Sequence, residues 1–439
     1  MKKYSAYKTS GIEWAEAIPN SWRCCEIAHF TTSKSGGTPD RGKKSYWENG
    51  TIPWMSSGEV NKVNVYDTEE HITELGMQMS SAKMLDINTV VIALNGQGKT
   101  KAMSAILRIK STCNQSLCGF KCDERNLHYT YLFYCFQTMY KYLRSQAGDD
   151  SRDGISAFSV TKQRIPVPSF DEQIAIAAYL DAKCAKVDNV ISVQQKRIEL
   201  LKELKQSVIT NAVTKGLDKN VEFKPSGIEW IGDIPEKWEV GKIKFYSTLH
   251  NGDRSSEYPN AKELVDEGVL FLTSNNIHNL ILDVSNVQNK YITDEKYKRL
   301  GGAKICLNDI VFCLRGSIGN CSINTSISKG TVASSLVVIR PNRINAFFLN
   351  YALHSNIVES QTCIAMNGSC AANLSAENVG NYYIAIPPKD VQEHITFYLN
   401  KKCSAIDNQI SKIERQIELL KEYKQSIITE CVTGKRKVC

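Results

Sequence analysis

The sequence predicts an α+β protein with a pseudo-twofold internal repeat, in which two globular domains are joined by two long helices that form an antiparallel coiled coil. The first observation is a short segment, SGIEW at residues 10–14, which returns at residues 226–230 with the same IP and W after it. The second is a longer repeat, because residues 179–210 return as residues 398–429 with about 19 of 32 positions identical. The third is that the inserts between these repeats, each roughly 130 residues long, hardly resemble each other. A chain that repeats its connecting segments and varies its inserts suggests recognition of a two-part target.

Composition indicates a globular protein with a moderate positive bias. The 439 residues are enough for about two to four domains, and 42% hydrophobic residues can build their cores. The formal net charge is +8, from 54 Lys and Arg against 46 Asp and Glu. This charge is spread along the chain, so a surface for nucleic acid has to be assembled by folding.

The cysteines and the first residues predict a cytoplasmic protein without a metal or a cofactor. The 15 cysteines are odd in number and scattered, and neither the Cys24-Cys25 pair nor Cys118 with Cys122 has a second pair at zinc-site spacing. The chain begins with polar residues rather than an apolar leader, and no stretch reaches the roughly 18 apolar residues of a membrane span. We therefore expect reduced thiols and no membrane contact.

Each long repeat carries a stripe of residues at alternating steps of three and four, which is typical of a coiled-coil seam. We expect spacer helices at residues 169–214 and 390–434, with a linker at residues 215–225 after the first. Lys205 and Lys424 interrupt the stripes, where a polar residue can fix the register. The seam is formed by Leu180, Val187, Ile191, Ile198 and Leu201 in the first copy and by Leu399, Ile406, Ile410, Ile417 and Leu420 in the second.

The predicted helix starts carry capping signals. Ser169 with Glu172, and Asp390 with Glu393, have the spacing of a capping box, and prolines precede both. An alternative to the coiled coil is that each stripe packs into its own domain, as most amphipathic helices do. The shared register and the duplication favour mutual packing.

The inserts predict two α+β domains, at residues 1–160, which include the N-terminal repeat segment 10–27, and at residues 226–386. Both contain short runs of β-type residues and helical patterns between glycine and asparagine turns. The strand-like runs are residues 89–94 and 309–314, and the helical patterns are residues 129–145 and 346–360.

A glycine-containing loop follows the strand-like run in each insert. The GQGKT run at residues 96–100 invites comparison with a phosphate-binding loop, but Ala93 stands where that loop needs its first glycine. Nucleotide binding through Gly98-Lys99-Thr100 is therefore the less favoured alternative. Asn and Gln can pair with adenine edges, and Arg or Lys with guanine. The residues that we expect these loops to present are Asn95, Gln97, Lys99, Arg315 and Ser317.

A second polar loop, SKSGGTPDR at residues 33–41, supplies backbone amides and cations that suit phosphate oxygens. Residues 251–255 take the comparable place in the second insert, and an ordinary solvated loop is the alternative in both. The candidates for phosphate contact are Lys34, Gly36, Gly37, Thr38, Arg41, Lys43, Lys44, Asn251, Arg254 and Lys298.

Catalytic signatures are missing from the chain. It has no glycine-rich S-adenosylmethionine loop, and its only Pro-Asp step, Pro39-Asp40, lacks the acidic-x-Lys pattern of the common nuclease core. The seven histidines are dispersed, without HExxH spacing. We expect a non-catalytic binding subunit.

The arrangement resembles the specificity subunit of type I restriction–modification systems across essentially the whole chain. The residues that carry the resemblance are the repeated SGIEW, IP and W segments, Gly36-Gly37-Thr38-Pro39 with Tyr46-Trp47 and Ile52-Pro53-Trp54, and the IELL run at residues 198–201 and 417–420. In the second insert, the segment expected to align with residues 52–57 is Phe271-Leu272-Thr273-Ser274-Asn275-Asn276-Ile277.

The resemblance implies two target-recognition domains, each of which reads one half of a bipartite double-stranded DNA target. It also implies that the helices set the distance between the half-sites and dock two adenine-methylating modification subunits, with restriction subunits joining the complex. A bacterial or archaeal cytoplasmic protein associated with the nucleoid is expected. The aligned segments add Ser56, Ser57, Ser274, Asn275 and Asn276 to the candidate DNA contacts. The rival to this reading is a coiled-coil scaffold that binds protein without reading bases.

Overall fold

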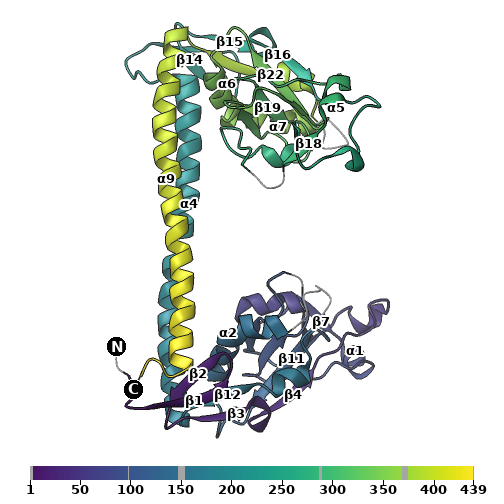
Figure 1. The fold of residues 1–439 in the computed structure, drawn as a ribbon, viewed down its shortest axis with the longest axis vertical. Coiled ribbons are helices and arrows are strands. Elements are labelled where there is room, and N and C mark those ends of the chain that lie inside the picture. The colour runs from purple at the N-terminus through teal and green to yellow at the C-terminus, as the bar shows by residue number, and fades with distance from the viewer. Residues whose placement is uncertain (1–2, 97, 147–153, 286–288, 368–373, 439) are drawn as a thin grey trace. The chain divides into compact units, whose positions relative to one another are not determined.

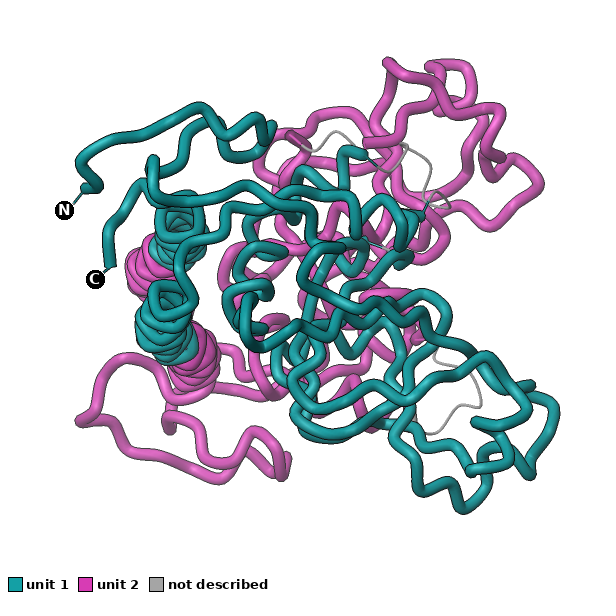
Figure 2. Tube along the Cα trace, turned by 90° about the horizontal axis from the view of Figure 1, so that it is seen from below, with its two compact units in different colours: residues 1–194, 415–439 teal, residues 195–414 magenta. Residues whose placement is uncertain are grey.

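The computed structural model describes residues 3–96, 98–146, 154–285, 289–367 and 374–438. The chain divides into two compact units (Figure 2). Unit 1 comprises residues 1–194 and 415–439, and unit 2 comprises residues 195–414. Two long helices, α4 (Phe170–Lys215) and α9 (Lys389–Val432), each contribute one part to each unit (Figure 1).

The two long helices pack on each other inside each unit. In unit 1 the first part of α4 shares a core with the end of α9, through Leu180 and Cys184 on one helix and Cys431 on the other. In unit 2 the end of α4 shares a core with the start of α9, through Ala212 and Leu399. The helices are therefore antiparallel, which confirms the predicted coiled coil. The predicted seam residues are buried, except for the half-buried Ile198, Leu201 and Leu420.

The alternative packing of the stripes also has support, because the ends of both helices belong to the cores of the units. In unit 1, Leu180 lies in one apolar cluster with Trp22 and Phe136. In unit 2, Leu399 lies in one cluster with Trp238. Each stripe therefore packs both against the other helix and against its own unit.

The predicted capping boxes are wrong in part. The Glu172 backbone N–H donates to Ser169 Oγ at 3.4 Å, but the Glu172 carboxylate accepts from Trp22 Nε1 at 3.1 Å and from the Tyr4 hydroxyl instead of the Ser169 N–H. At the second start, α9 already begins at Lys389, so Asp390 lies in the first turn rather than at the N-cap. Packing against the N-terminal segment thus takes the carboxylate that a capping box would use.

Unit 1 is built from one larger and several smaller sheets. Its five-stranded sheet has the order β4-β11-β8-β9-β6, and a three-stranded sheet has the order β10-β5-β7. Two strand pairs, the hairpin β1-β2 and the long-range pair β3-β12, complete it. The strands are β1 (Tyr7–Ile12), β2 (Ala15–Pro19), β3 (Arg23–Glu26), β4 (Thr31–Ser35), β5 (Ile52–Met55), β6 (Asn64–Val65), β7 (Glu70–Ile72), β8 (Val90–Ala93), β9 (Ser104–Leu107), β10 (Thr112–Cys113), β11 (Leu117–Cys122) and β12 (Arg164–Val167). The short helices are α1 (Glu74–Gln78), α2 (Tyr129–Gln146), α3 (Ala157–Thr161) and the 3₁₀ turns η1 (Ile27–His29), η2 (Lys44–Tyr46) and η3 (Ser57–Lys62).

Unit 2 repeats this architecture. Its four-stranded sheet has the order β16-β22-β19-β20, its three-stranded sheet the order β18-β17-β21, and its strand pairs are β13-β14 and β15-β23. The strands are β13 (Phe223–Pro225), β14 (Asp233–Pro235), β15 (Glu239–Lys242), β16 (Ser247–Asn251), β17 (Val269–Leu272), β18 (Lys290–Ile292), β19 (Ile310–Cys313), β20 (Cys321–Ile323), β21 (Gly330–Val332), β22 (Leu336–Pro341) and β23 (Tyr383–Ile386). The helices are α5 (Asp294–Arg299), α6 (Ala346–Leu353), α7 (Asn356–Asn367), α8 (Ala376–Gly380) and the 3₁₀ turns η4 (Ile243–Phe245), η5 (Ala261–Glu263) and η6 (Ser274–Asn276).

The two inserts therefore share a fold although their sequences hardly match. In both units the second strand of the larger sheet pairs antiparallel with its two neighbours, and the central strand of the smaller sheet pairs antiparallel with one neighbour and parallel with the other. The helix predicted at residues 129–145 is confirmed as α2. The one predicted at residues 346–360 is interrupted, because Ser355 Oγ donates to Ala352 O at 2.6 Å where α6 ends, and the Ser355 carbonyl starts α7.

In the residues that the structure describes, no helix combines the length and the apolar character needed to cross a bilayer. In the same residues no group of three or more His, Cys, Asp and Glu side chains is arranged to hold a metal ion.

Candidate nucleic-acid interface

In unit 1 the three loops that hold most of the predicted contacts meet at one short segment, residues 113–117. The Gly37 N–H donates to Cys113 O at 2.8 Å, and the Asn114 N–H donates to the carbonyl of Met55, the residue before the predicted Ser56 and Ser57, at 3.0 Å. The loop after β8 joins them, because the Leu94 N–H donates to Ser116 O at 2.8 Å. The Thr38 hydroxyl is hydrogen-bonded to the Gln115 side chain.

In unit 2 the corresponding loops meet at residues 333–336. The Gly252 N–H donates to Leu336 O at 3.2 Å, and the Ala333 N–H donates to Leu272 O at 2.8 Å. The Leu314 N–H donates to Ser335 O at 2.8 Å. Each unit therefore gathers the loops after three strands at one end of its sheets, around a segment that the sequence analysis did not single out.

The glycines of the first loop are required by close packing. A Cβ atom at Gly36 would lie 2.2 Å from the Asn114 carbonyl oxygen, and one at Gly37 would lie 2.3 Å from Ser81 Oγ. A Cβ atom at Gly252 would lie 2.1 Å from the Ala333 carbonyl oxygen. Side chains are therefore excluded at these positions by the fold, and contact of Gly36 or Gly37 with phosphate stays a prediction.

Arg41 of unit 1 is held by aromatic rings and by a carboxylate. Its guanidinium carbon lies 3.9 Å from the centroid of the Trp47 ring and 4.8 Å from that of Trp54. The guanidinium also donates two hydrogen bonds to Glu70, one of them at 2.8 Å. This bidentate contact holds the pKa of Glu70 below its usual range. The planar guanidinium of Arg41 is thus oriented before any ligand arrives. Glu70 lies 29 residues further along the chain, so no local sequence pattern indicates that it pairs with Arg41.

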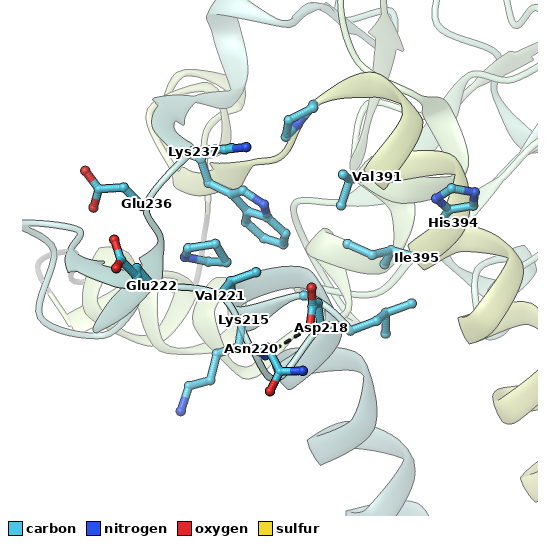
Figure 3. A pocket seen from close by; sticks show the side chains of 15 residues that line it. Lys215, Asp218, Asn220, Val221, Glu222, Glu236, Lys237, Val391, His394 and Ile395 are labelled. Carbon is cyan, nitrogen blue, oxygen red and sulfur yellow. Dashed lines mark hydrogen bonds between the residues drawn. The ribbon is translucent and has the colours of Figure 1, made fainter.

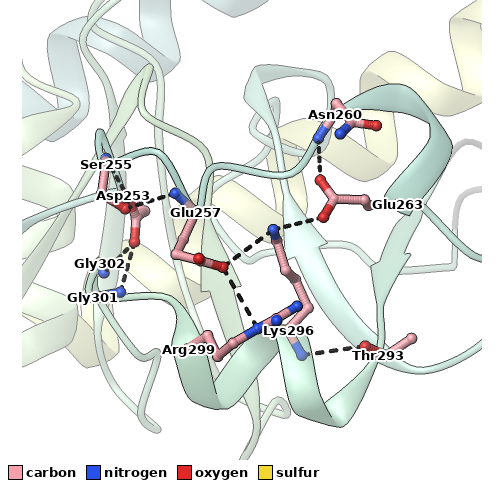
Figure 4. Close-up of polar contacts among 10 residues, drawn as sticks. All are labelled: Asp253, Ser255, Glu257, Asn260, Glu263, Thr293, Lys296, Arg299, Gly301 and Gly302. Atoms are coloured by element: carbon pink, nitrogen blue, oxygen red, sulfur yellow. Dashed lines mark hydrogen bonds and ion pairs between the residues drawn. The ribbon is translucent and has the colours of Figure 1, made fainter.

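Unit 2 stabilises the equivalent loop with a buried carboxylate (Figure 4). Asp253 follows Gly252 and accepts from the Ser255 N–H and hydroxyl, both at 2.6 Å, and from the backbone N–H groups of Gly301 at 2.6 Å and Gly302 at 3.1 Å. Burial opposes the charge on Asp253, but these hydrogen bonds outweigh it and lower the pKa of the carboxyl.

A buried lysine reinforces the same region of unit 2. Lys296 in α5 contacts Glu263 at 2.8 Å and Glu257 at 3.5 Å, and Arg299 contacts Glu257 at 3.5 Å (Figure 4). The hydrogen bond to Glu263 raises the pKa of Lys296. Lys298, the predicted contact in this helix, is exposed.

The loops after β8 and β19 run from strand to strand. The first loop leads into β9, with Gly98 at φ +59°, and the second leads into β20, with Gly316 at φ +75°. A phosphate-binding loop leads into a helix whose N-terminal N–H groups face the phosphates. The alternative of nucleotide binding through Gly98-Lys99-Thr100 is therefore contradicted by the backbone. Gln97 lies outside the described residues.

Two of the aligned candidates, Ser56 and Asn276, take part in the caps of short 3₁₀ helices. The Ser56 N–H donates to Glu59 at 2.8 Å, and the Thr273 N–H donates to Asn276 at 2.9 Å, each completing a capping box. Asn276 is buried by this role and also donates to Asn289 at 2.9 Å. The shared cap position aligns residues 52–57 with residues 269–274, so the predicted alignment with a segment that starts at Phe271 is wrong by two residues. Ser57 and Ser274 are half-buried next to these caps, whereas Asn275 is exposed.

The remaining candidates are mostly exposed cations and amides. Lys34 donates to Met84 O at 3.2 Å, Lys43 to the Tyr46 hydroxyl at 3.3 Å, and Lys44 lies 3.4 Å from Glu48. Four of the candidate cations have no side-chain hydrogen bond or ion pair to the residues that the structure describes, and they are the exposed Lys99, Arg254, Lys298 and Arg315. Such cations are suited to phosphate oxygens or guanine edges. Asn95, Asn251 and Ser317 are exposed as well.

Sequence comparison assigns both units to one family. The family model described as "Type I restriction modification DNA specificity domain" matches residues 19–203 and again residues 235–420. The chain belongs to this family. It thus carries two DNA specificity domains, which confirms the resemblance to type I specificity subunits. The function of this family is the recognition of DNA targets.

Relatives of similar length share this description. The chain is 23% identical to the type I restriction enzyme MjaVIII specificity subunit of Methanocaldococcus jannaschii, over 96% of this chain and 94% of the relative. It is 24% identical to the MjaIX specificity subunit of the same organism, over 96% and 95%. A solved chain described under complex assembly and conformational transition of the type I R-M system aligns with a TM-score of 0.69 at 15% identity, over 94% of this chain and 98% of that one. This likeness confirms the fold.

Proposed function

We propose that the chain is the non-catalytic specificity subunit of a type I restriction–modification complex, in which each unit reads one half of a bipartite double-stranded DNA target. The observation that carries this proposal is the repeated site. Both units bring the loops after three equivalent strands to one short segment, 113–117 or 333–336, and line it with different side chains. One backbone frame with two sets of contact residues suits two different half-sites.

The contacts fall into two groups in this proposal. The unpaired cations Lys99, Arg254 and Lys298 neutralise phosphates, which makes the affinity depend on salt. Asn95 and Arg315 lie on the loops closest to the central segments and have the side-chain chemistry that reads base edges. Gln115 joins them, because it is exposed on the central segment of unit 1 and contacts the loop with Thr38.

The partners follow from the same proposal. Methylation of adenine needs a modification subunit, because the chain shows no S-adenosylmethionine loop of its own. We propose that two modification subunits and the restriction subunits assemble on this chain, in the cytoplasm and at the nucleoid.

The experiment is a genome-wide map of methylated adenines in cells that carry the complete system with Arg315→Ala or Gln115→Ala. We expect Arg315→Ala to relax the base preference in one half of the motif and Gln115→Ala to relax it in the other half. A lost bidentate contact is worth about 1–3 kcal/mol of discrimination, or roughly 5- to 150-fold. Lys219→Gln, an exposed change in the linker after α4, serves as the control and should leave the motif unchanged.

A change in both half-sites by either variant would contradict the assignment of one half-site to each unit. The scaffold alternative is tested on the same proteins by electrophoretic shift with the matched duplex and a random duplex. A scaffold binds both equally.

A further inference from the structure

The two units differ at the place where a long helix ends against the repeated IP and W residues. In unit 1 the end of α9 reaches Trp22, and a Cβ atom at Gly434 would lie 3.2 Å from the Trp22 ring. In unit 2 the end of α4 reaches Trp238, and a Cβ atom at Gly216 would lie 3.1 Å from that ring. In both units a glycine just after the long helix therefore lies against the repeated tryptophan.

An internal aromatic side chain fills the site in unit 1. The Tyr4 ring meets the Trp22 ring edge-on, with centroids 5.7 Å apart. The Tyr4 hydroxyl donates to Glu172, and Glu172 also accepts from Trp22 Nε1 at 3.1 Å. Tyr4 and Trp22 thus share Glu172 as their hydrogen-bond acceptor, and the indole N–H of Trp22 is satisfied.

The equivalent positions in unit 2 hold different residues. Tyr7 faces Pro19 across β1 and β2, as Phe223 faces Pro235 across β13 and β14, so Asn220 stands where unit 1 has Tyr4. Gln173 donates to Pro168 O, as Gln392 donates to Pro387 O, so Val391 stands where unit 1 has Glu172. Both members of the group that closes the site in unit 1 are therefore replaced.

The result is a cavity of about 540 Å³ next to Trp238 (Figure 3). Its apolar wall is formed by Trp238, Pro235, Val391 and Ile395. Charged side chains stand around it, among them Lys215, Asp218, Glu236 and Lys237. Within the residues that the structure describes, Trp238 Nε1 has no hydrogen-bond acceptor, whereas the indole of Trp22 has one.

The surface near this cavity is more apolar than the equivalent surface of unit 1, where Tyr7, 37% exposed, takes the place of Phe223. Leu217 and Phe223 are 41% and 43% exposed, and Phe397, one turn after His394 of the cavity wall, is 74% exposed. By the offset of the long repeat, unit 1 has Arg436 in place of Leu217 and Ala178 in place of Phe397. Exposed apolar side chains next to a lined cavity mark a site for a protein partner.

We propose that this cavity is a docking site for an aromatic side chain presented by a partner polypeptide, namely the modification subunit. This inference rests on the proposed function, which supplies that partner. The chemistry is the one that Tyr4 shows in unit 1, with a ring packed edge-on against the tryptophan. Because Val391 replaces the acidic acceptor, the partner also supplies the oxygen that accepts from Trp238 Nε1.

The test rebuilds the unit 1 arrangement in unit 2, by Asn220→Tyr combined with Val391→Glu in the full chain. The new ring fills the cavity, so we expect the melting temperature to stay the same or rise. The affinity for the modification subunit, measured by calorimetric titration, should fall roughly tenfold or more, which is typical for the loss of an aromatic anchor. Val391→Phe fills the cavity with a single change and should act in the same direction if the double variant does not fold.

The reciprocal change, Tyr4→Asn with Glu172→Val, opens the site in unit 1 and serves as the matched control. It should lower the melting temperature and leave the affinity for the modification subunit within about twofold. Equal losses of affinity in both double variants would overturn the proposal, because the effect would then come from disturbed helix ends. Unchanged affinity in the filled variants would also overturn it.

The outcomes separate this inference from the proposed function. If the wild-type chain does not bind the modification subunit, the proposed function fails. If the wild-type chain and the filled variants bind it equally, only the docking site fails. If sedimentation shows that the wild-type chain self-associates and the filled variants do not, the occupant is a second copy of the chain and the proposed partner is wrong.

Discussion

The two units make the same close backbone contact, but the glycine that permits it lies on a different side of the contact in each unit. In unit 1 the loop after β4 approaches the segment after α1, and the glycine at the contact, Gly37, belongs to the loop. In unit 2 the loop after β16 approaches the segment after α5, and the glycine, Gly302, belongs to the segment. The loop of unit 2 is then free to carry a side chain, and Asp253 uses it to bind the N–H groups of Gly301 and Gly302. The close approach is common to both units, whereas the residue that permits it is not.

This comparison explains why contact residues cannot be carried from one unit to the other by sequence position. A position that is closed to side chains in one unit can hold an ionised carboxylate in the other. The candidate DNA contacts of the two units therefore have to be tested separately, and the scaffold beneath them can be tested as a pair.

The largest effect is expected from substitution of the two glycines at this contact. A Cβ atom at Gly302 would lie 2.2 Å from the Asp253 backbone nitrogen, and one at Gly37 would lie 2.5 Å from the Ala82 nitrogen. Because backbone must move in both cases, Gly37→Ala and Gly302→Ala should each lower the free energy of unfolding by about 2–3 kcal/mol. Denaturant unfolding measures the loss, and hydrogen exchange assigns it to a unit.

Gly301→Ala is the matched control for this prediction. The atom nearest to its added Cβ is Asp253 Oδ2 at 3.8 Å, so the substitution meets no clash. A loss as large as that of Gly302→Ala would mean that flexibility of the segment matters rather than the close approach.

The framework of the fold was predictable because the repeat lies in the helices and in the segments that pack on them. Residues 179–210 and 398–429 keep the same apolar positions, and periodicity alone places their buried faces. The common topology of the inserts was not predictable, because it rests on backbone hydrogen bonds to residues 113–117 and 333–336. Backbone bonds leave the side chains free to differ, so no sequence match marks them.

The candidate site was predictable only in its exposed part. Loops with glycine, asparagine and basic residues were found from composition, and most of their cations lie on the surface. The supporting contacts were missed, since Arg41 meets Glu70 and Asp253 meets Gly301 through the folded chain. Local patterns contain no information on such long-range partners.

A second, smaller effect is expected from Asp253 of unit 2, which takes the place that Gly37 has in unit 1. Asp253→Asn places an amide NH₂ opposite backbone N–H donors, so it should cost about 2 kcal/mol of stability in unit 2 at neutral pH. The pKa of Asp253 is lowered in the folded chain. Its contribution is therefore present above the unfolded pKa of about 3.9 and is lost as the pH falls through the folded value. Acid unfolding followed by hydrogen exchange should show this loss in the wild type and not in Asp253→Asn.

Asp283→Asn is the control for this carboxylate. Asp283 makes the same turn, accepting from the Ser285 N–H at 2.9 Å and from the Ser285 hydroxyl at 2.7 Å, but it is exposed and has no glycine amides as partners. A smaller effect is expected. Equal effects of the two variants would assign the stability to the turn rather than to the contact with Gly301 and Gly302.

The smallest effect concerns the feature in which the units agree, the ion pair across the long helices. Lys205 Nζ lies 2.7 Å from Asp407 in unit 2, and Lys424 Nζ lies 2.6 Å from Asp188 in unit 1. Because all four side chains are partly exposed, a double-mutant cycle to alanine should give a coupling of about 0.5 kcal/mol in each unit, reduced by salt.

The coupling energies of the two ion pairs should also be equal. The same lysine and aspartate recur at repeat-related positions, so each unit should hold its helix pair in the same register by the same contact. The charge-swapped variant Lys205→Asp with Asp407→Lys should keep most of the coupling, since both side chains stay across the same seam. A coupling well above 1 kcal/mol in one unit and none in the other would show that the surroundings of each pair, rather than the repeated pair itself, determine its strength.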